Sequence, residues 1–331
     1  MASDLARDLF QGGHRSSLTD TTEDELAEVI AGLLHAPPTV SPRWLYDDVG
    51  SALFEAITRL PEYYPTRCEV EILDGAGPQI AARLPENLAV VELGAGTGDK
   101  VARVIRNLVS PRIYHPIEVS TAALDRAAEQ ITSAFPDLAV RGLLGDFTNS
   151  QALTELLAKV AADGPVLLFF PGSTIGNFDP DEAADLLSAA GAALEPGAPF
   201  LIGFDLVKDP ALLEAAYDDP AGVTAAFNRN LLAHLNRRFG ATFDPARWRH
   251  TSRWIPALRR IETWLLSEGD QVVTIGGTEL SFGDGDGIHT ENAHKWDQAA
   301  VTALAKRSGW RVDGWWTDDK NWFAEALLVR A

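Results

Sequence analysis

Three groups of residues have the types and spacing that could hold a nucleoside. The run E-L-G-A-G-T-G at residues 92–98 follows a short apolar segment, and glycines at such a bend let the backbone turn sharply and approach a ligand closely. Glu118 ends the next apolar segment, where its carboxylate can accept hydrogen bonds from both hydroxyls of a ribose. Asp146 and Phe147 follow a third segment and offer an acceptor beside an aromatic face that suits adenine. The three groups agree, so the sequence predicts one nucleoside site at the ends of successive strands.

The spacing of the glycines narrows the choice of ligand. A dinucleotide-binding loop reads G-x-G-x-x-G and sets a helix N-terminus against a pyrophosphate. Here the loop reads G-x-G-x-G, and Glu92 stands two positions before the first glycine. This pattern resembles the first motif of the class I S-adenosylmethionine methyltransferases, whose ligand has no pyrophosphate. The resemblance implies S-adenosylmethionine as the cofactor, with S-adenosylhomocysteine as its product, and contacts to it from Glu92, Gly94, Gly96, Thr97, Lys100, Glu118, Asp146 and Phe147.

Alternating strands and helices must position these groups. Amphipathic helical stretches, of which Asp181–Leu194 is the clearest, separate the apolar segments. Such alternation implies right-handed βαβ crossovers and a parallel sheet with helices on both faces. We therefore predict an α/β fold with a Rossmann-like doubly wound sheet of the class I methyltransferase type. Its strands are expected at Ala89–Leu93, Ile113–Val119, Leu138–Leu144, Val166–Pro171 and Pro199–Asp205.

Residues 206–293 break this alternation and read as an insert. One helical stretch at Asp209–Arg238 is followed by strand-like runs at Arg260–Ser267, Gln271–Ile275 and Thr278–Phe282. The α/β pattern then returns with a helix at Trp296–Ser308 and strands near Trp310–Trp316 and Phe323–Arg330.

The ends of the chain complete the predicted domain organisation. Residues 1–21 read as a loose polar arm, and a helix is expected to start at Thr22 and to end before Pro37. We predict an S-adenosylmethionine-binding domain at 68–206 plus 294–331. A smaller α+β substrate-binding lobe is predicted at 1–67 plus 207–293.

Composition excludes several classes of function. The 28 basic and 47 acidic residues give a net charge of −19, which argues against a surface that tracks nucleic-acid phosphates. No uncharged apolar run reaches membrane-spanning length, and the first residues lack the apolar core of a signal peptide. Cys68 is the only cysteine, so an internal disulfide and a multi-cysteine metal site are excluded. We expect a cytoplasmic monomer with a small-molecule substrate and with no nucleic-acid or membrane partner.

Longer motifs carry a more specific resemblance, which covers nearly the whole chain after about residue 40. They are W-L-Y-D at 44–47, F-E-A-I-T-R-L-P-E-Y-Y-P-T-R at 54–67, G-S-T-I-G-N at 172–177, Y-D-D-P-A-G-V-T-A-A-F-N at 217–228 and H-T-E-N at 289–292. In these motifs the chain resembles the histidine Nα-methyltransferases of ergothioneine biosynthesis and their fungal and bacterial relatives. The resemblance implies an enzyme that methylates the α-amine of a free amino acid, L-histidine first among the candidates, in three successive steps that end in a betaine.

The same resemblance implies roles for single residues. Asn177 and Tyr217 would hold the amino and carboxylate end of the substrate, and Tyr46 would complete the catalytic set near the amine. Tyr63 and Glu291 would each meet one nitrogen of the imidazole. The remaining substrate contacts would come from Phe54, Gly172, Thr174, Thr263 and Ala293. His289 and His294 flank Glu291, but we predict no metal site, because methyl transfer needs no metal and histidine ligands need further partners.

Two positions depart from the pattern of the family. Ala293 stands where the family commonly carries a serine that contributes to imidazole recognition, and Thr263 stands where a methionine is frequent. A lost hydroxyl partner removes about 0.5–1.5 kcal/mol of net hydrogen-bond energy, which can shift a substrate preference without excluding histidine. An Nα-methyltransferase for tryptophan or a related aromatic amino acid is therefore the alternative enzyme. A non-catalytic S-adenosylmethionine-binding module is the alternative from another class.

Overall fold

The computed structural model describes residues 22–331, which form two compact units. The first unit comprises Pro65–Val207 and Trp296–Ala331, and the second comprises residues 22–64 and Lys208–Lys295. These bounds differ from the predicted domain bounds by a few residues. The predicted arm at 1–21 lies outside the described residues.

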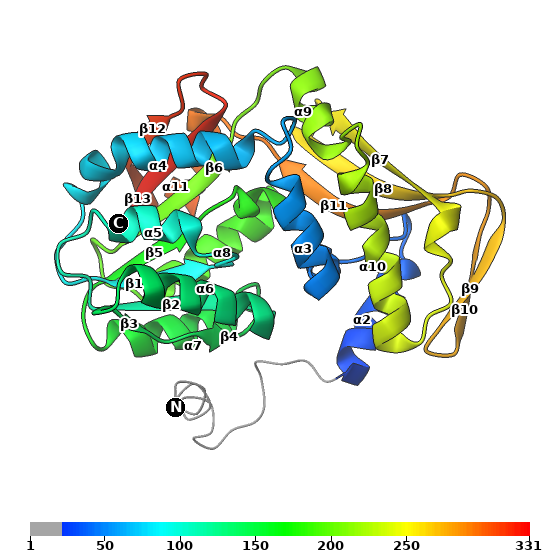
Figure 1. The fold of residues 1–331 in the computed structure, drawn as a ribbon, viewed down its shortest axis with the longest axis horizontal. Coiled ribbons are helices and arrows are strands. Elements are labelled where there is room, and N and C mark those ends of the chain that lie inside the picture. Colours follow the sequence, from blue (N-terminus) through cyan, green and yellow to red (C-terminus); the bar gives the residue numbers. More distant parts are fainter. Residues whose placement is uncertain (1–21) are drawn as a thin grey trace. The chain divides into compact units, whose positions relative to one another are not determined.

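The first unit is built on an eight-stranded sheet with the order β12-β13-β6-β5-β1-β2-β3, in which β4 also pairs with β2 (Figure 1). The strands from β1 to β6 run parallel, whereas β13 pairs antiparallel with both β6 and β12. The predicted doubly wound α/β fold is confirmed. Its strands are β1 Ala89–Leu93, β2 Ile113–Glu118, β3 Ala139–Val140, β4 Leu143–Leu144, β5 Val166–Phe170, β6 Pro199–Asp205, β12 Trp310–Thr317 and β13 Phe323–Arg330.

Helices cover both faces of this sheet. On one face lie α4 (Pro65–Ala81), α5 (Asp99–Ile105) and α6 (Thr121–Ala134). On the other lie α7 (Ser150–Ala161), α8 (Pro180–Ala192) and α11 (Gln298–Arg307). Local sequence sets where they begin, as at α8, where Asp179 and Glu182 form a capping box ahead of Pro180 at the first helical position.

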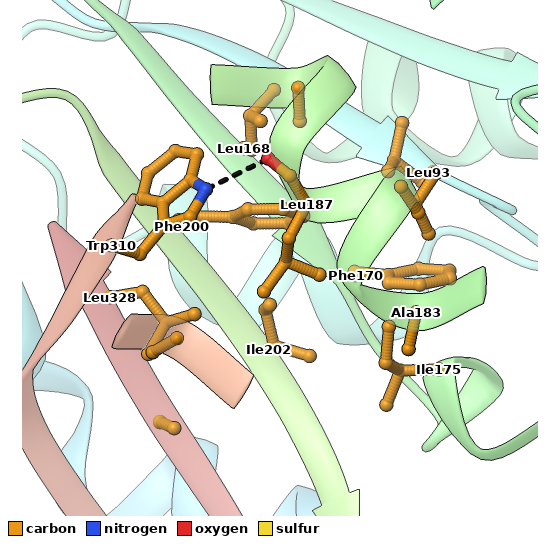
Figure 2. Close-up of a cluster of buried hydrophobic side chains, with 14 of the residues drawn as sticks. Leu93, Leu168, Phe170, Ile175, Ala183, Leu187, Phe200, Ile202, Trp310 and Leu328 are labelled. Atoms are coloured by element: carbon orange, nitrogen blue, oxygen red, sulfur yellow. Dashed lines mark hydrogen bonds between the residues drawn. The ribbon is translucent and has the colours of Figure 1, made fainter. Parts of the chain in front are cut away.

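The main hydrophobic core lies between the sheet and the second group of helices. Figure 2 shows Leu168 and Phe170 of β5 and Phe200 of β6 packed against Leu187 of α8. Trp310 completes this layer, and its indole N–H donates to the Leu187 carbonyl at 2.8 Å. Because side chains alternate along a strand, the residues between these positions face α4, α5 and α6 instead.

The second unit combines helices with two small antiparallel sheets. Its helical elements are α2 Thr22–Leu33, η1 Pro42–Leu45, α3 Asp48–Ile57, α9 Pro210–Tyr217, α10 Val223–Phe239 and η3 Pro245–Arg247. Strands β9 (Gln271–Ile275) and β10 (Thr278–Phe282) form a hairpin, and β7 (Trp248–Ile255), β8 (Arg260–Ser267) and β11 (Gly287–His294) form a sheet in the order β11-β8-β7. Within residues 22–331, none of the helices combines the length and apolar character that a bilayer crossing needs.

The structure corrects two predictions about elements and adds two strands that were not predicted. The stretch Asp209–Arg238 is two helices, because Asp219 accepts hydrogen bonds from the N–H groups of Val223 and Thr224 and so starts a new helix. The expected strand Leu138–Leu144 is divided into β3 and β4. Strands β7 and β11 were not predicted. Strand prediction depends on alternating apolar residues, and both strands contain many polar residues that interrupt this alternation.

The core supports a stability prediction. Leu187 is fully buried, so Leu187→Ala leaves a cavity and is expected to lower the free energy of unfolding by about 2–5 kcal/mol. Urea denaturation followed by tryptophan fluorescence measures the change. The control Val109→Ala removes a side chain that is 54% exposed and is expected to change stability by less than about 0.5 kcal/mol. Equal effects of the two substitutions would contradict this account of the core.

Candidate active site

The glycine loop joins β1 to α5 at the carboxyl end of the sheet. Gly94, Gly96 and Gly98 all have positive φ angles, of 71°, 54° and 77°, which residues with side chains rarely adopt. The loop therefore turns back sharply, and α5 begins at once with Asp99. This turn places Lys100 in the first turn of α5.

Two carboxylates stand beside the loop. Glu118 at the end of β2 accepts a hydrogen bond from the Gly96 N–H through Oε1 at 2.8 Å. Burial raises the pKa of Glu118, while this backbone hydrogen bond and one from Val119 oppose the rise. Glu92 of β1 is buried and accepts from the Tyr114 hydroxyl, and burial raises the pKa of Glu92 well above its usual range.

An apolar pocket is lined by residues from the end of β2, from β4 and from α7. Phe147 lies against Phe170 with ring centroids 5.4 Å apart, and Asp146 accepts from the Thr148 N–H at 2.8 Å. The pocket is lined by Ile117, Leu143, Leu144, Gly145, Asp146, Phe147, Ala152, Leu153 and Leu156. Aliphatic walls with one aromatic ring and one carboxylate suit the flat, hydrogen-bonding base of a nucleoside.

The loop after β5 carries Gly172, Thr174 and Asn177. The Thr174 hydroxyl donates to the Pro171 carbonyl at 2.9 Å, and Thr174–Asn177 forms a 3₁₀ turn. Ser173 adopts a left-handed conformation with φ of 58°, and its hydroxyl accepts from the Asp205 N–H at 2.9 Å. These bonds fix the loop at the same edge of the sheet as the glycine loop, because β5 and β1 are parallel neighbours.

Aromatic side chains form a continuous series in the second unit. Tyr46 lies 5.6 Å from Phe54, Phe54 lies 6.1 Å from Tyr63, and Tyr63 lies 6.4 Å from Tyr217, measured between ring centroids. All three pairs meet edge to face, the geometry that aromatic quadrupoles favour. Residues that are far apart in the sequence are thereby brought together in one cluster of aromatic rings.

A buried cation adjoins this series. Lys295 is 3% exposed, and its Nζ donates to the Tyr217 hydroxyl at 2.8 Å while lying 4.5 Å from the centre of the same ring. Burial raises the pKa of Glu291 to about 7, although the positive charge of Lys295 lowers it. Glu291 therefore changes its charge near neutral pH, and it can accept from an imidazole N–H when it is ionised.

Glu291 belongs to a row of polar side chains across the sheet. The register sets Glu291 of β11 opposite Thr263 of β8, and Thr263 opposite Ser252 of β7. The hydroxyls of Thr263 and Ser252 lie 3.0 Å apart. Ala293 follows two positions later on the same face of β11, where it is 4% exposed.

The structure thus places the predicted residues in two sets. The donor residues and Gly172, Thr174 and Asn177 meet at one edge of the first sheet, and the remaining predicted residues belong to the second unit. Within residues 22–331, no three His, Cys, Asp or Glu side chains are grouped so as to hold a metal ion.

Sequence reasoning missed two residues, Glu69 and Lys295. Glu69 forms an ion pair with Lys100 and accepts from the Gly172 N–H at 2.8 Å. A signal for it exists in the sequence, since Glu69 shares the buried stripe of α4 with Cys68 and Ile72. Lys295 follows the H-T-E-N motif closely, but nothing in the sequence shows that it is buried.

Several known methyltransferases are similar to this chain over most of its length. A histidine N-alpha-methyltransferase of Mycobacterium tuberculosis is 40% identical over 308 residues, which cover 92% of this chain and 94% of that protein. The histidine N-alpha-methyltransferase of Mycolicibacterium smegmatis shows the same identity and coverage. A 4-dimethylallyltryptophan N-methyltransferase of Epichloe festucae var. lolii is 26% identical over 322 residues, or 90% of this chain and 93% of that protein.

The family profile extends over both units. The profile described as histidine-specific methyltransferase, SAM-dependent, matches residues 25–330. It includes the glycine loop, the aromatic series and the H-T-E-N motif of β11. This chain therefore belongs to the family of histidine-specific, S-adenosylmethionine-dependent methyltransferases.

Proposed function

We propose that this enzyme transfers methyl groups from S-adenosylmethionine to the α-amine of free L-histidine, in three successive steps that yield a betaine. The choice of substrate depends on Glu291. Its carboxyl has a pKa of about 7 and, when ionised, can accept a hydrogen bond from an imidazole N–H. The relatives named as histidine N-alpha-methyltransferases support the same choice.

In this proposal the first unit holds the methyl donor. The Glu118 carboxylate accepts hydrogen bonds from the ribose hydroxyls, and the pocket at Asp146 and Phe147 binds the adenine. The glycine loop with Glu92, Gly94, Gly96 and Thr97 lies along the rest of the donor, and Lys100 meets its carboxylate. When bound, the donor supplies a methyl group made electrophilic by a positively charged sulfur.

The amino acid is held chiefly by neutral groups. Asn177 and Tyr217 hold its amino and carboxylate end, and Tyr46 and Phe54 lie near the amine. Neutral partners leave the lone pair of the amine available, and ring faces attract a cationic product by about 0.5–2 kcal/mol each. On the imidazole side, Tyr63 and Glu291 each donate to or accept from one nitrogen. Further substrate contacts are assigned to Gly172 and Thr174 of the first unit and to Thr263 and Ala293 of the second.

Positioning supplies most of the catalysis in this proposal. Residues that hold the amine in line with the methyl group can contribute up to about 7–11 kcal/mol, because orientation is fixed before the reaction. The amine must first lose a proton, since α-amines titrate at about 7.7–8.0 or above. The proton leaves to bulk water before the transfer, and no strong general base is required.

A direct assay tests the proposed function. Purified enzyme is incubated with S-adenosylmethionine and L-histidine, and the amino-acid products are followed by mass spectrometry. We expect successive gains of one, two and three methyl groups, all on the α-nitrogen. Donor binding without methylation of any amino acid would instead identify a non-catalytic binding module.

Tryptophan is the second candidate substrate. No hydroxyl stands at position 293, the Thr263 hydroxyl already meets Ser252, and one relative is named for a tryptophan derivative. Methylation of L-tryptophan in preference to L-histidine under competition would favour this alternative.

Ala293→Ser tests the specificity directly. A hydroxyl at this buried position adds a hydrogen bond worth about 0.5–1.5 kcal/mol to the imidazole, so kcat/KM for histidine is expected to rise about 2–10-fold relative to tryptophan. Competition between the two amino acids, read by mass spectrometry, measures the ratio. An unchanged ratio would remove position 293 from the recognition of the imidazole.

Glu118→Ala tests the donor site. Loss of hydrogen bonds from the ribose hydroxyls to a charged acceptor costs about 1.5–3 kcal/mol, so the Kd for S-adenosylhomocysteine should rise about 10–100-fold. Isothermal titration calorimetry measures it, with the exposed Glu129→Gln on α6 as the matched control. A wild-type Kd for Glu118→Ala would exclude this role.

The pH dependence of histidine binding tests Glu291. Its raised pKa means that the carboxyl is protonated below about pH 7 and becomes a strong acceptor only as the pH rises through that value. With S-adenosylhomocysteine present, we expect wild type to bind histidine more tightly than Glu291→Gln by a ratio that grows between about pH 6 and pH 8. The ratio cancels the titration of histidine itself. A ratio that stays constant over this range, or an equal effect of the exposed Glu279→Gln, would contradict the assignment.

A further inference from the structure

Buried acids collect on the face of the first sheet that packs against α4 and α5. Ala324, Ala326 and Leu328 of β13 point into the main core, so Glu325 points to the opposite face, where it is fully buried. Glu69 of α4 is also fully buried and faces it. Burying one carboxylate already costs several kcal/mol unless it is paired, so two together need a specific explanation.

Glu69 is a bridge between two loops of the site. Its Oε1 accepts from the Gly172 N–H at 2.8 Å, and its Oε2 pairs with Lys100 Nζ. These partners are close to each other, since a Cβ added to Gly172 would lie 3.4 Å from Lys100 Nζ. A single carboxylate therefore ties the start of α5 to the loop that follows β5.

Glu325 has no comparable partner. Among residues 22–331, no N–H or O–H group of the protein donates to either of its carboxyl oxygens. The Glu69 carboxyl is within hydrogen-bonding reach of it. Two ionised carboxylates cannot hydrogen-bond, so this contact requires a proton on one of them.

Space for the pair depends on Gly203 of β6. The register sets Gly203 directly opposite Glu325, on the same face of the sheet. A Cβ at Gly203 would lie 2.8 Å from Glu69 Oε1 and 2.9 Å from the Phe323 ring, closer than such contacts occur. The absence of a side chain at this position lets the carboxyl pair fit beneath α4.

We propose that Glu69 and Glu325 share one proton, and that the resulting singly charged pair positions Lys100 and the Gly172 backbone for the methyl donor. The inference rests on the proposed contact of Lys100 with the donor carboxylate. Glu69 and Glu325 are then positioning residues, since they act through Lys100 and Gly172.

The surrounding charges favour a single negative charge on the pair. Burial raises the pKa of Glu325 well above its usual range, and Glu69 raises it further, while Lys100 opposes the rise. On the same face, Glu92 accepts from Tyr114, Glu118 accepts from Gly96, and Asp205 is fully buried. Among the groups named here only Lys100 is cationic, so it can balance one of the two charges that full ionisation would place on Glu69 and Glu325.

Infrared spectroscopy of the donor-free protein tests the shared proton. We expect the wild-type protein to show the C=O stretch of a protonated carboxyl that persists above the pH at which exposed carboxyls ionise and shifts in heavy water. Glu325→Gln should remove that band, because an amide then donates to Glu69 in place of the proton. Absence of a band that Glu325→Gln removes would overturn the proposal, whether or not the protein is an active methyltransferase.

Calorimetric titration with S-adenosylhomocysteine tests the positioning role. Glu69→Gln should raise the Kd at least tenfold, because an amide presents N–H groups toward Lys100 or Gly172. The conservative Glu325→Gln should keep the Kd within about threefold of wild type, and the exposed Glu86→Gln serves as the matched control on the same unit.

The infrared band and the Kd for S-adenosylhomocysteine distinguish a failure of this inference from a failure of the proposed function. A thermal unfolding transition shows whether the Glu69→Gln variant is folded. If the variant is folded and binds S-adenosylhomocysteine with the wild-type Kd, the positioning role is overturned. Wild-type protein that shows the infrared band but no affinity for S-adenosylhomocysteine would instead contradict the proposed function. If Glu69→Gln does not fold, the infrared comparison still decides the protonation of the pair.

Discussion

The alternation of side chains along the central strands determines which residues of the first unit form its apolar core and which face the other side of the sheet. One face of β1, β5, β6 and β13 is apolar and forms the main core with α7, α8 and α11. The other face carries Glu92, Asp205 and Glu325 among its apolar residues, and all three are buried. Successive side chains of a strand point to opposite faces of the sheet. One face can therefore pack into the apolar core, while the other face holds charged groups beneath α4 and α5.

This division between an apolar and a charged face explains how a sheet with an apolar core can position polar loops at its edge. Parallel register sets the ends of β5, β1 and β2 at one edge, and the loops that follow them carry the glycines, Glu118 and Asn177. The loops are then fixed by hydrogen bonds from buried groups, as in the bond from the Gly172 N–H to Glu69. In a low-dielectric interior such bonds are strong, and an unpaired charge there is costly, so the charges beneath the loops must be balanced closely.

The second unit uses a different device. The substrate contacts proposed for Thr263 and Glu291 stand on a small antiparallel sheet, where the cross-strand register sets both residues in one row with Ser252. Lys295 links this row to the aromatic series through Tyr217. Burial raises the pKa of Glu291 to about 7 although the Lys295 ammonium lowers it, so this carboxyl titrates near neutrality, in the range where an imidazole side chain also titrates.

The sequence alone determined the doubly wound fold, the position of the glycine loop and the family, because these depend on local periodicity and on motifs whose residues are close together in the chain. Strands β1, β6, β8, β9, β10 and β13 have the bounds that their apolar patterns predict. The break between α9 and α10 depended on a side-chain cap at Asp219, and strands β7 and β11 carry polar residues that local patterns do not recognise as strands. Only the tertiary structure showed that Glu69 faces Glu325 and that Lys295 is buried beside Tyr217, because burial and the pairing of charges are set by residues more than seventy positions away, and no local pattern records them.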